Sequence, residues 1–276
     1  VTQWEAAEDE QWMINSHNGI KELGIPPVKL ETEYPVLWNH IVAHEKKLVV
    51  RLDKGDHWSN LRNCAYIRDF QKPKIVYPNM TKYLPFYLDT TEHFFINDKA
   101  FILTTETESL AYLTAALNST VFRCCFMDNF PNLGEDRREL RKIFMDKIPI
   151  KKPTAQQAAL FEALVPMVQA TKAESQKSDN SELKSVASFL EEVIDACVME
   201  VYFSDHMAEH RLGIMTHVTP LLQDFDAAAP PAQQVTAAQQ FYAQANDSKH
   251  PIRNILIRIP VDSPDLLAVI QREGAV

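Results

Sequence analysis

Apolar residues recur at helical spacing early in the chain and again in its second half. A first helix face is formed by Tyr34, Leu37, Trp38, Ile41 and Val42. Residues 108–118 and 121–126 predict two more helices. Beyond residue 154, two long helical patterns flank the polar residues 174–181, and Thr154 with Gln157 three residues later has the arrangement of a capping box. This spacing predicts an antiparallel helical hairpin.

Strand-like runs lie between these two helical regions. Residues 74–77, 93–97 and 100–104 are rich in β-branched and aromatic side chains, which favours strands. Asn97 and Asp98 predict the turn of a hairpin between residues 94–96 and 101–103. Near the end of the chain, residues 255–259 also have a strand-like pattern, followed by a short helix after Pro264.

The patterns together predict a mixed α/β fold, in which a strand-containing domain precedes the antiparallel helical hairpin. We expect a lead-in at residues 1–45, the strand-containing domain at 46–152, the hairpin at 153–223, and a linker with a C-terminal segment at 224–276. The proline-bearing residues 224–236 are the expected linker. The first residue is Val, and Trp4 and Trp12 occur with no element before them, so we expect the chain to begin within a longer protein.

Charge is distributed unevenly along the chain. The net charge of −9 argues by itself against binding to nucleic acid. Residues 46–152, however, hold 18 Lys and Arg against 13 Asp and Glu, so this segment is +5 and the remainder is −14. A basic middle between acidic ends is consistent with a polyanionic partner, and the alternative is a chance fluctuation of solvated surface charge.

Glycine usage argues against a nucleotide site. The chain has six glycines, and no two are close enough to form a phosphate-cradling turn of the kind that dinucleotides and S-adenosylmethionine require. The four cysteines have no two-residue gap typical of zinc or redox motifs, which indicates reduced thiols: Cys64, Cys124, Cys125 and Cys197.

The chain has no sequence signal for a membrane or for secretion. No apolar run approaches the roughly 20 residues that span a bilayer, and residues 1–10 are acidic and polar, unlike a signal peptide. We therefore expect a cytoplasmic protein with no membrane partner.

Five short segments occur in an order that resembles a known family. They are Trp58-Ser59-Asn60-Leu61-Arg62, then residues 72–79 (Lys-Pro-Lys-Ile-Val-Tyr-Pro-Asn), Phe95-Ile96-Asn97-Asp98, residues 113–119 ending in Leu-Asn-Ser, and Lys147-Ile148-Pro149-Ile150. Together they resemble the TaqI-like C-terminal specificity domain of adenine-specific DNA methyltransferases. Residues 189–206 resemble the helix that follows this domain in combined restriction-modification enzymes, so the resemblance covers about residues 12–206.

The resemblance implies a target-recognition domain that reads a short duplex sequence. A separate N-terminal domain of the same protein would methylate adenine and bind S-adenosylmethionine, with or without an accompanying restriction endonuclease. The base-clamping Asn-Pro-Pro-Tyr motif of that domain does not occur here, since Asn79 lies between Pro78 and Met80. We therefore expect this chain to be catalytically inactive and without a cofactor. Its expected partners are double-stranded DNA and its own upstream methyltransferase domain.

Candidate DNA contacts come from the basic middle of the chain. Those suited to phosphates are Arg51, Lys54, Arg62, Lys72, Lys74, Lys82, Arg137, Arg138 and Arg141. Those suited to base edges are Asn60, Arg62, Asn79 and Arg123. Each is alternatively an ordinary solvated side chain. Trp58, one helical turn from Arg62, is expected either to stack on DNA or to serve as a buried anchor. Residues 136–142 are expected to form a helix, touching the DNA backbone or merely exposed.

Two other functions stay open. One is a protein-interaction module without a DNA role, in which the basic middle is incidental. The other is a hydrolase using the carboxylates Asp53, Asp56, Asp69 and Asp89, although no nuclease or nucleophile motif accompanies them. A metal site at His206, His210, Asp205 and His217 is set aside, because histidines at a helix end are commonly exposed and favourable to its dipole.

Overall fold

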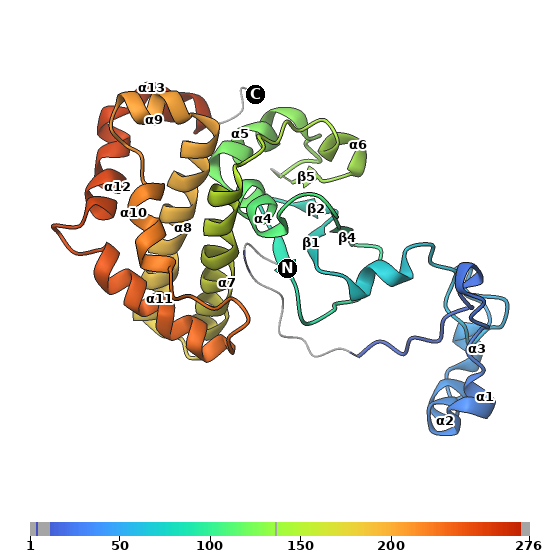
Figure 1. Ribbon diagram of the computed structural model, residues 1–276. Coiled ribbons are helices and arrows are strands. Elements are labelled where there is room, and N and C mark those ends of the chain that lie inside the picture. The colour runs from blue at the N-terminus through green and yellow to red at the C-terminus, as the bar shows by residue number, and fades with distance from the viewer. Residues whose placement is uncertain (1–3, 5–11, 136, 272–276) are drawn as a thin grey trace. The chain divides into compact units, whose positions relative to one another are not determined.

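The computed structural model describes Trp4, residues 12–135 and residues 137–271. These residues form two compact units, one within residues 8–72 and one made of Trp4 with residues 73–271 (Figure 1). The mixed α/β fold is confirmed, with small antiparallel sheets among many helices. The unit boundary falls inside residues 46–152. The four-part organisation stays a prediction, because packing units and functional domains need not coincide.

The smaller unit consists of short helical segments joined by loops. Its elements are η1 (Lys21–Leu23), α1 (Leu30–Glu33), α2 (Pro35–Val42), α3 (Glu45–Leu48) and η2 (Ile67–Gln71). The helix predicted from Tyr34 onward is confirmed as α2, which begins at Pro35 because proline at the first helical position lacks only an N–H that would have no partner there. Few apolar side chains are buried in this unit, namely Leu30 and Phe70 among its described residues.

The larger unit contains an antiparallel sheet in the order β3-β1-β4. Its strands are β1 (Lys74–Pro78), β3 (Tyr87–Asp89) and β4 (Ala100–Leu103). In the central strand β1, Ile75 is opposite Leu88 on one side and Leu103 on the other. Lys74 to Tyr77 are all buried, because both edges of β1 are paired and the strand is covered on both faces. Two shorter strands, β2 (Met80–Thr81) and β5 (Arg138–Glu139), form a second sheet.

The hairpin predicted between residues 94–96 and 101–103 is wrong. The turn itself is present, since the Asn97 side chain accepts a hydrogen bond from the Lys99 N–H at 2.9 Å. However, residues 93–97 are not a strand, and β4 pairs with β1 instead. The cause is the carboxylate of Asp89, which accepts hydrogen bonds from the backbone N–H groups of His93 and Phe94 at 3.0 and 2.7 Å and so holds this segment in a loop.

The predicted helices after residue 108 are confirmed, and side chains cap them. They are α4 (Leu110–Asn118), α5 (Thr120–Asn129), α7 (Ala155–Lys177) and α8 (Ser181–Tyr202). A short helix that the sequence did not predict, α6 (Lys142–Met145), lies between α5 and α7 and has no side-chain cap. Both halves of the capping box at Thr154 and Gln157 are formed. Helices α7 and α8 pack against each other as an antiparallel hairpin (Figure 1). The described residues 182–202 are entirely helical, as predicted.

Six further helical segments follow the hairpin in the described residues. They are α9 (Ser204–Glu209), α10 (Met215–Val218), η3 (Thr219–Leu222), α11 (Pro231–Ala245), α12 (Pro251–Asp262) and α13 (Pro264–Ile270). The strand predicted at residues 255–259 is wrong, because Ile252, Ile255 and Ile259 are buried at helical spacing on one face of α12. The linker predicted at residues 224–236 ends early, since Pro231 begins α11.

Two side-chain amides pair with the outer edge of the segment that contains β3. Asn118 at the end of α4 accepts a hydrogen bond from the N–H of Phe86 and donates one to its carbonyl, at 3.1 and 2.8 Å. Gln169 in α7 does the same with Leu88, at 3.1 and 3.0 Å. A primary amide has the same donor and acceptor as a backbone peptide, so the two side chains substitute for a neighbouring strand. Buried backbone groups are thereby satisfied, and the sheet is joined to the helices.

Removing one of these amides tests how much the sheet depends on it. We expect Gln169→Ala to lower the free energy of unfolding by about 1–3 kcal/mol, because the N–H and carbonyl of Leu88 lose their partner. The matched control is Gln156→Ala, which makes the same change at an exposed position of the same helix. Urea unfolding followed by circular dichroism measures both. Equal midpoints for the two variants would contradict the expectation.

A buried ion pair joins β1 to β3. The Lys74 Nζ lies 2.6 Å from Asp89 Oδ2, and both side chains have 0% exposure. Lys72, two residues earlier, forms an exposed ion pair with Asp69 at 2.8 Å. The two lysines therefore have different energetics, since a buried charge without its partner is far more costly than an exposed one.

We expect Lys74→Met to destabilise the protein by about 3–5 kcal/mol, because the Asp89 carboxylate would stay buried without its cation. Lys72→Met should cost about 1 kcal/mol or less, since water replaces the lost partner. Thermal unfolding of the two variants, measured side by side, gives the comparison. A small effect at both positions would mean that the Asp89 carboxylate does not depend on Lys74.

Candidate nucleic-acid interface

The short sheet of β2 and β5 brings together segments that are far apart in sequence. Thr81 is opposite Arg138, and Met80 is opposite Glu139. Just before β2, the carbonyl of Asn79 accepts a hydrogen bond from the N–H of Leu140 at 2.8 Å. The described residues 79–82, 130–135 and 137–141 therefore form one structural feature, which we call the basic hairpin surface.

The loop of residues 132–138 is held in a defined turn. The N–H of Leu133 donates to the carbonyl of Arg137 at 2.7 Å, and the Asn132 side chain accepts from the N–H of Gly134 at 2.9 Å. Gly134 has φ +92° and Glu135 has φ +51°, and these positive values reverse the chain here. Glycine adopts a positive φ at low cost. The turn leaves Arg137 exposed. The helix predicted at residues 136–142 is wrong for the described residues 137–142, which form β5 and the start of α6; Asp136 lies outside the described residues.

Three of the predicted phosphate contacts are exposed cations on the basic hairpin surface. Lys82, Arg137 and Arg141 are exposed. Arg137 pairs with Glu135, and Arg141 Nε pairs with Glu139 at 2.7 Å. Exposed ion pairs contribute little to stability, so these guanidinium groups can exchange a carboxylate for a phosphate at low cost.

Arg138 differs from its two arginine neighbours. It is half-buried, and its Nη1 donates to the carbonyl of Phe130 at 2.9 Å, which holds the hairpin closed. In β1, burial raises the pKa of Tyr77 to about 12, and the charge of Asp146 acts in the same direction.

The remaining predicted contacts of the larger unit are not among the three exposed cations of the basic hairpin surface. Lys74 is buried in its ion pair with Asp89, so no phosphate can reach its ammonium group in this conformation. Asn79 is half-buried and donates to the carbonyl of Asp98 at 3.3 Å. Arg123 is exposed on α5.

In the smaller unit, Asn60 is a structural residue. It is 2% exposed, and its Nδ2 lies within 3.3 Å of the carbonyl oxygens of Ser16, His17 and Val28. A buried amide with these partners is not available to a base edge. The sequence placed Asn60 among the base-reading candidates because its type fits that role, whereas its partners lie more than 30 residues away and leave no local signal.

The other candidates of this unit surround the same loop. Arg51 Nη2 donates to the carbonyls of Trp58 and Asn60 at 3.2 and 3.4 Å, and Lys54 Nζ donates to the carbonyl of Val49. Arg62 and Lys72 are exposed. Arg51, Lys54 and Trp58 are half-buried, so each keeps some accessible surface.

An aromatic cluster in this unit was only partly predicted from the sequence. Trp58 packs against Trp38 and His57, with ring centroids 5.3 Å apart in both cases. Trp38 belongs to α2, and its helical spacing indicated a buried face rather than a ring beside Trp58. The sequence feature that could have predicted the cluster is the adjacency of two aromatic residues, His57 and Trp58, in a loop.

Two of the four carboxylates of the alternative hydrolase are held in ion pairs. Asp89 is fully buried and forms an ion pair with Lys74, and Asp69 forms one with Lys72. Within residues 12–135 and 137–271, no three His, Cys, Asp or Glu side chains come together as a metal site. The His206 and His210 rings do approach to 4.4 Å, but His206 Nε2 lies 2.8 Å from the Ser263 hydroxyl and is hydrogen-bonded there.

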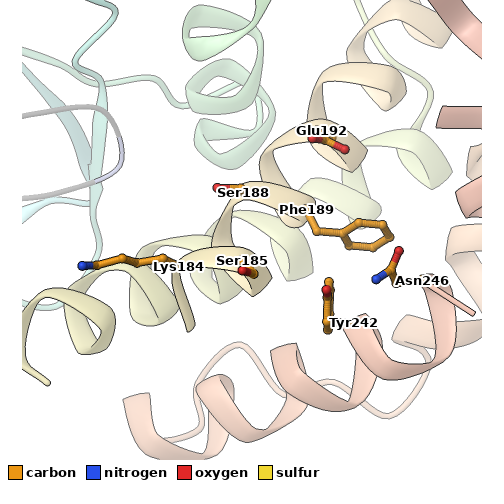
Figure 2. A pocket seen from close by; sticks show the side chains of 7 residues that line it. All are labelled: Lys184, Ser185, Ser188, Phe189, Glu192, Tyr242 and Asn246. Carbon is orange, nitrogen blue, oxygen red and sulfur yellow. The ribbon is translucent and has the colours of Figure 1, made fainter. Parts of the chain in front are cut away.

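An open cavity of about 380 Å³ lies between α8 and α11 (Figure 2). Phe189 and Tyr242 form its aromatic side, while Ser185, Ser188 and Glu192 contribute polar groups. Burial, with the neighbouring Glu191 charge, raises the pKa of Glu192. This cavity lies in the helical region and contains none of the predicted DNA contacts.

No single helix of the described chain is long and apolar enough to cross a bilayer. Helices α4 and α5 meet that length and composition only as a pair, and the pair is bent by 67°.

Comparison with known families agrees with the resemblance in the sequence. The family model described as the TaqI-like C-terminal specificity domain matches residues 25–150. This confirms the resemblance over these residues, which include every candidate contact from Arg51 to Arg141. A search of curated proteins found no match to the chain.

The polar centre of the smaller unit gives a direct test of its folding. We expect Asn60→Asp to destabilise residues 12–72, because a carboxylate would face three carbonyl oxygens that now receive an N–H donor. Asn63→Asp is the matched control, since the Asn63 Oδ1 already acts as an acceptor for Asn18 Nδ2 at 2.9 Å. Hydrogen exchange of peptides from residues 12–72 should rise for Asn60→Asp alone. Equal protection in both variants would contradict the role given to Asn60.

Proposed function

We propose, from the premise that residues 25–150 are a TaqI-like C-terminal specificity domain, that this chain binds duplex DNA and selects the sequence on which a restriction-modification enzyme acts. The family has a DNA-specificity role in methyltransferase and restriction enzymes. For this chain we propose the more specific role of target recognition for an adenine-specific DNA methyltransferase, acting in the cytoplasm.

The observation that carries the proposal is the basic hairpin surface. β2 and β5 bring Lys82, Arg137 and Arg141 into one exposed region from positions more than 50 residues apart. Arginine and lysine contacts to phosphates position a protein on the duplex, and most of its nonspecific affinity comes from the counterions that they release.

Catalysis is assigned to another domain of the protein. This chain has neither the base-clamping motif nor a glycine-rich cofactor turn. S-adenosylmethionine would therefore be held by the methyltransferase domain, which would also extrude the target adenine from the duplex. The role left to this chain is to hold the duplex in the correct register.

The test is the dependence of DNA affinity on salt. We expect the logarithm of the association constant to fall linearly with the logarithm of salt concentration between about 20 and 200 mM. Replacing Lys82, Arg137 and Arg141 with Ala should make the slope shallower by about one unit for each lost phosphate contact. Fluorescence anisotropy of a labelled duplex measures both proteins. Arg138 is left intact, because its bond to the Phe130 carbonyl closes the hairpin.

The control variant replaces three exposed lysines of the helical region, Lys177, Lys184 and Lys249, with Ala. It removes the same charge from residues outside the matched segment, so its slope should equal that of the unmodified protein. Equal slopes for both triple variants would mean that the basic hairpin surface does not contact the DNA phosphates. If the unmodified chain binds no duplex at the lowest salt, the alternative of a protein-interaction module is favoured instead.

A further inference from the structure

Three aromatic rings in the smaller unit form one continuous cluster. The ring centroids of Trp38 and Trp58 are 5.3 Å apart, those of His57 and Trp58 are 5.3 Å apart, and those of Trp38 and His57 are 6.3 Å apart. Their planes are tilted by 35° to 39°, so the rings pack at their edges as well as their faces. The cluster combines a helix, α2, with a loop that is held by the Asn60 network.

The cluster is not the hydrophobic core of its unit. Trp38 and Trp58 are half-buried and His57 is exposed, whereas the buried positions around them are polar, including Ser16, Ser59 and Asn60. Large aromatic side chains are usually well buried or placed where their surface contacts a ligand or partner. Two tryptophans that remain accessible beside a polar interior indicate a surface that contacts a ligand or partner.

The segment that carries His57 and Trp58 is basic. Residues 46–72 hold seven Lys and Arg against three Asp and Glu. Arg51 Nη2 donates a hydrogen bond to the carbonyl of Trp58, and Lys54 and Arg62 flank His57 and Trp58 in the sequence. An aromatic surface with cations around it is the arrangement by which proteins bind nucleic acid with its bases out of the stack, since the cations attract the phosphates and the rings stack on the bases.

We propose that the Trp38–His57–Trp58 cluster stacks on an unpaired base of DNA bound by this chain, an inference that rests on the DNA-binding function proposed above. In a fully paired duplex, both faces of every internal base are covered by its neighbours. An aromatic ring can gain a base face only where a base has left the helix, at a mismatch, a bulge or a locally opened step. The cluster therefore recognises distorted or opened DNA, while the basic hairpin surface contacts the duplex backbone.

The experiment compares a fully paired duplex with the same duplex carrying one unpaired thymine. We expect the full chain to bind the bulged duplex at least about fivefold more tightly, the smallest gain typical of one stacked base. Trp58→Leu, which keeps an apolar side chain without the ring, should lower the affinity for the bulged duplex to the affinity that the same variant has for the paired duplex. Trp58→Phe should retain part of it. Anisotropy titrations at fixed salt give the four affinities.

Trp12→Leu is the matched control, because Trp12 is 92% exposed and lies outside the cluster. It should retain the preference for the bulged duplex. If the unmodified chain binds both duplexes equally, or if Trp12→Leu and Trp58→Leu behave alike, the stacking inference is wrong while DNA binding itself stands. If neither duplex is bound, the proposed function fails and the inference fails with it.

A fluorescence measurement covers the case in which Trp58→Leu does not fold. In Trp12→Phe protein the remaining tryptophans are Trp4, which is 2% exposed, and the two of the cluster. Tryptophan emission should therefore be quenched by the bulged duplex and not by the paired duplex at equal saturation. Bound bulged DNA that leaves the emission unchanged would overturn the inference.

Discussion

The larger unit depends on the backbone of residues 86–89, which is hydrogen-bonded on both sides. One side pairs with β1, and the other is satisfied by the side-chain amides of Asn118 and Gln169. An edge strand without such partners exposes N–H and carbonyl groups or attracts another strand. Because Gln169 lies in α7, beyond residue 150 where the family match ends, the helical hairpin supports a sheet formed within the matched residues. The two parts are therefore one packed structure.

Burial, more than the count of basic residues, determines which cations face a polyanion. Lys72 and Lys74 are identical in type and two residues apart, yet Lys72 is exposed and Lys74 has no exposed surface. Residues two apart share a face of a strand, so alternation does not separate these two lysines; they differ because only Lys74 lies inside β1. One cation of residues 46–152 is thus internal, and its buried partner Asp89 belongs to the same segment, so the excess of positive charge is unchanged. Among the candidate phosphate contacts of the larger unit, Lys82, Arg137 and Arg141 are exposed.

Local signals in the sequence predicted most helices, whereas strand pairing required information that the sequence does not display locally. The capping box at Thr154 forms because its donor and acceptor are three residues apart, so the pattern and the structure coincide. β5 pairs with β2 across more than 50 residues, and no local pattern marks that partner. Residues 255–259 were misread because a short apolar run fits a strand or a buried helix face equally well. The exposed arginines were predictable by type, while the role of Asn60 depended on distant carbonyls.

The interior of the smaller unit buries few apolar side chains, and this bears on how tightly the unit would bind DNA. Among its described residues, Leu30 and Phe70 are the buried apolar side chains, while Val36 and Leu52 are 82% and 103% exposed. A unit that buries little apolar surface gains little of the main stabilising term and relies on hydrogen bonds, each contributing about 1 kcal/mol net. Ligands stabilise the state that binds them, so DNA on the aromatic cluster would also hold this unit in its folded form. Part of the free energy gained from the DNA contacts would be used to hold the unit in its folded form. Affinity measured for DNA should then be weaker than the number of aromatic and cationic contacts alone would suggest.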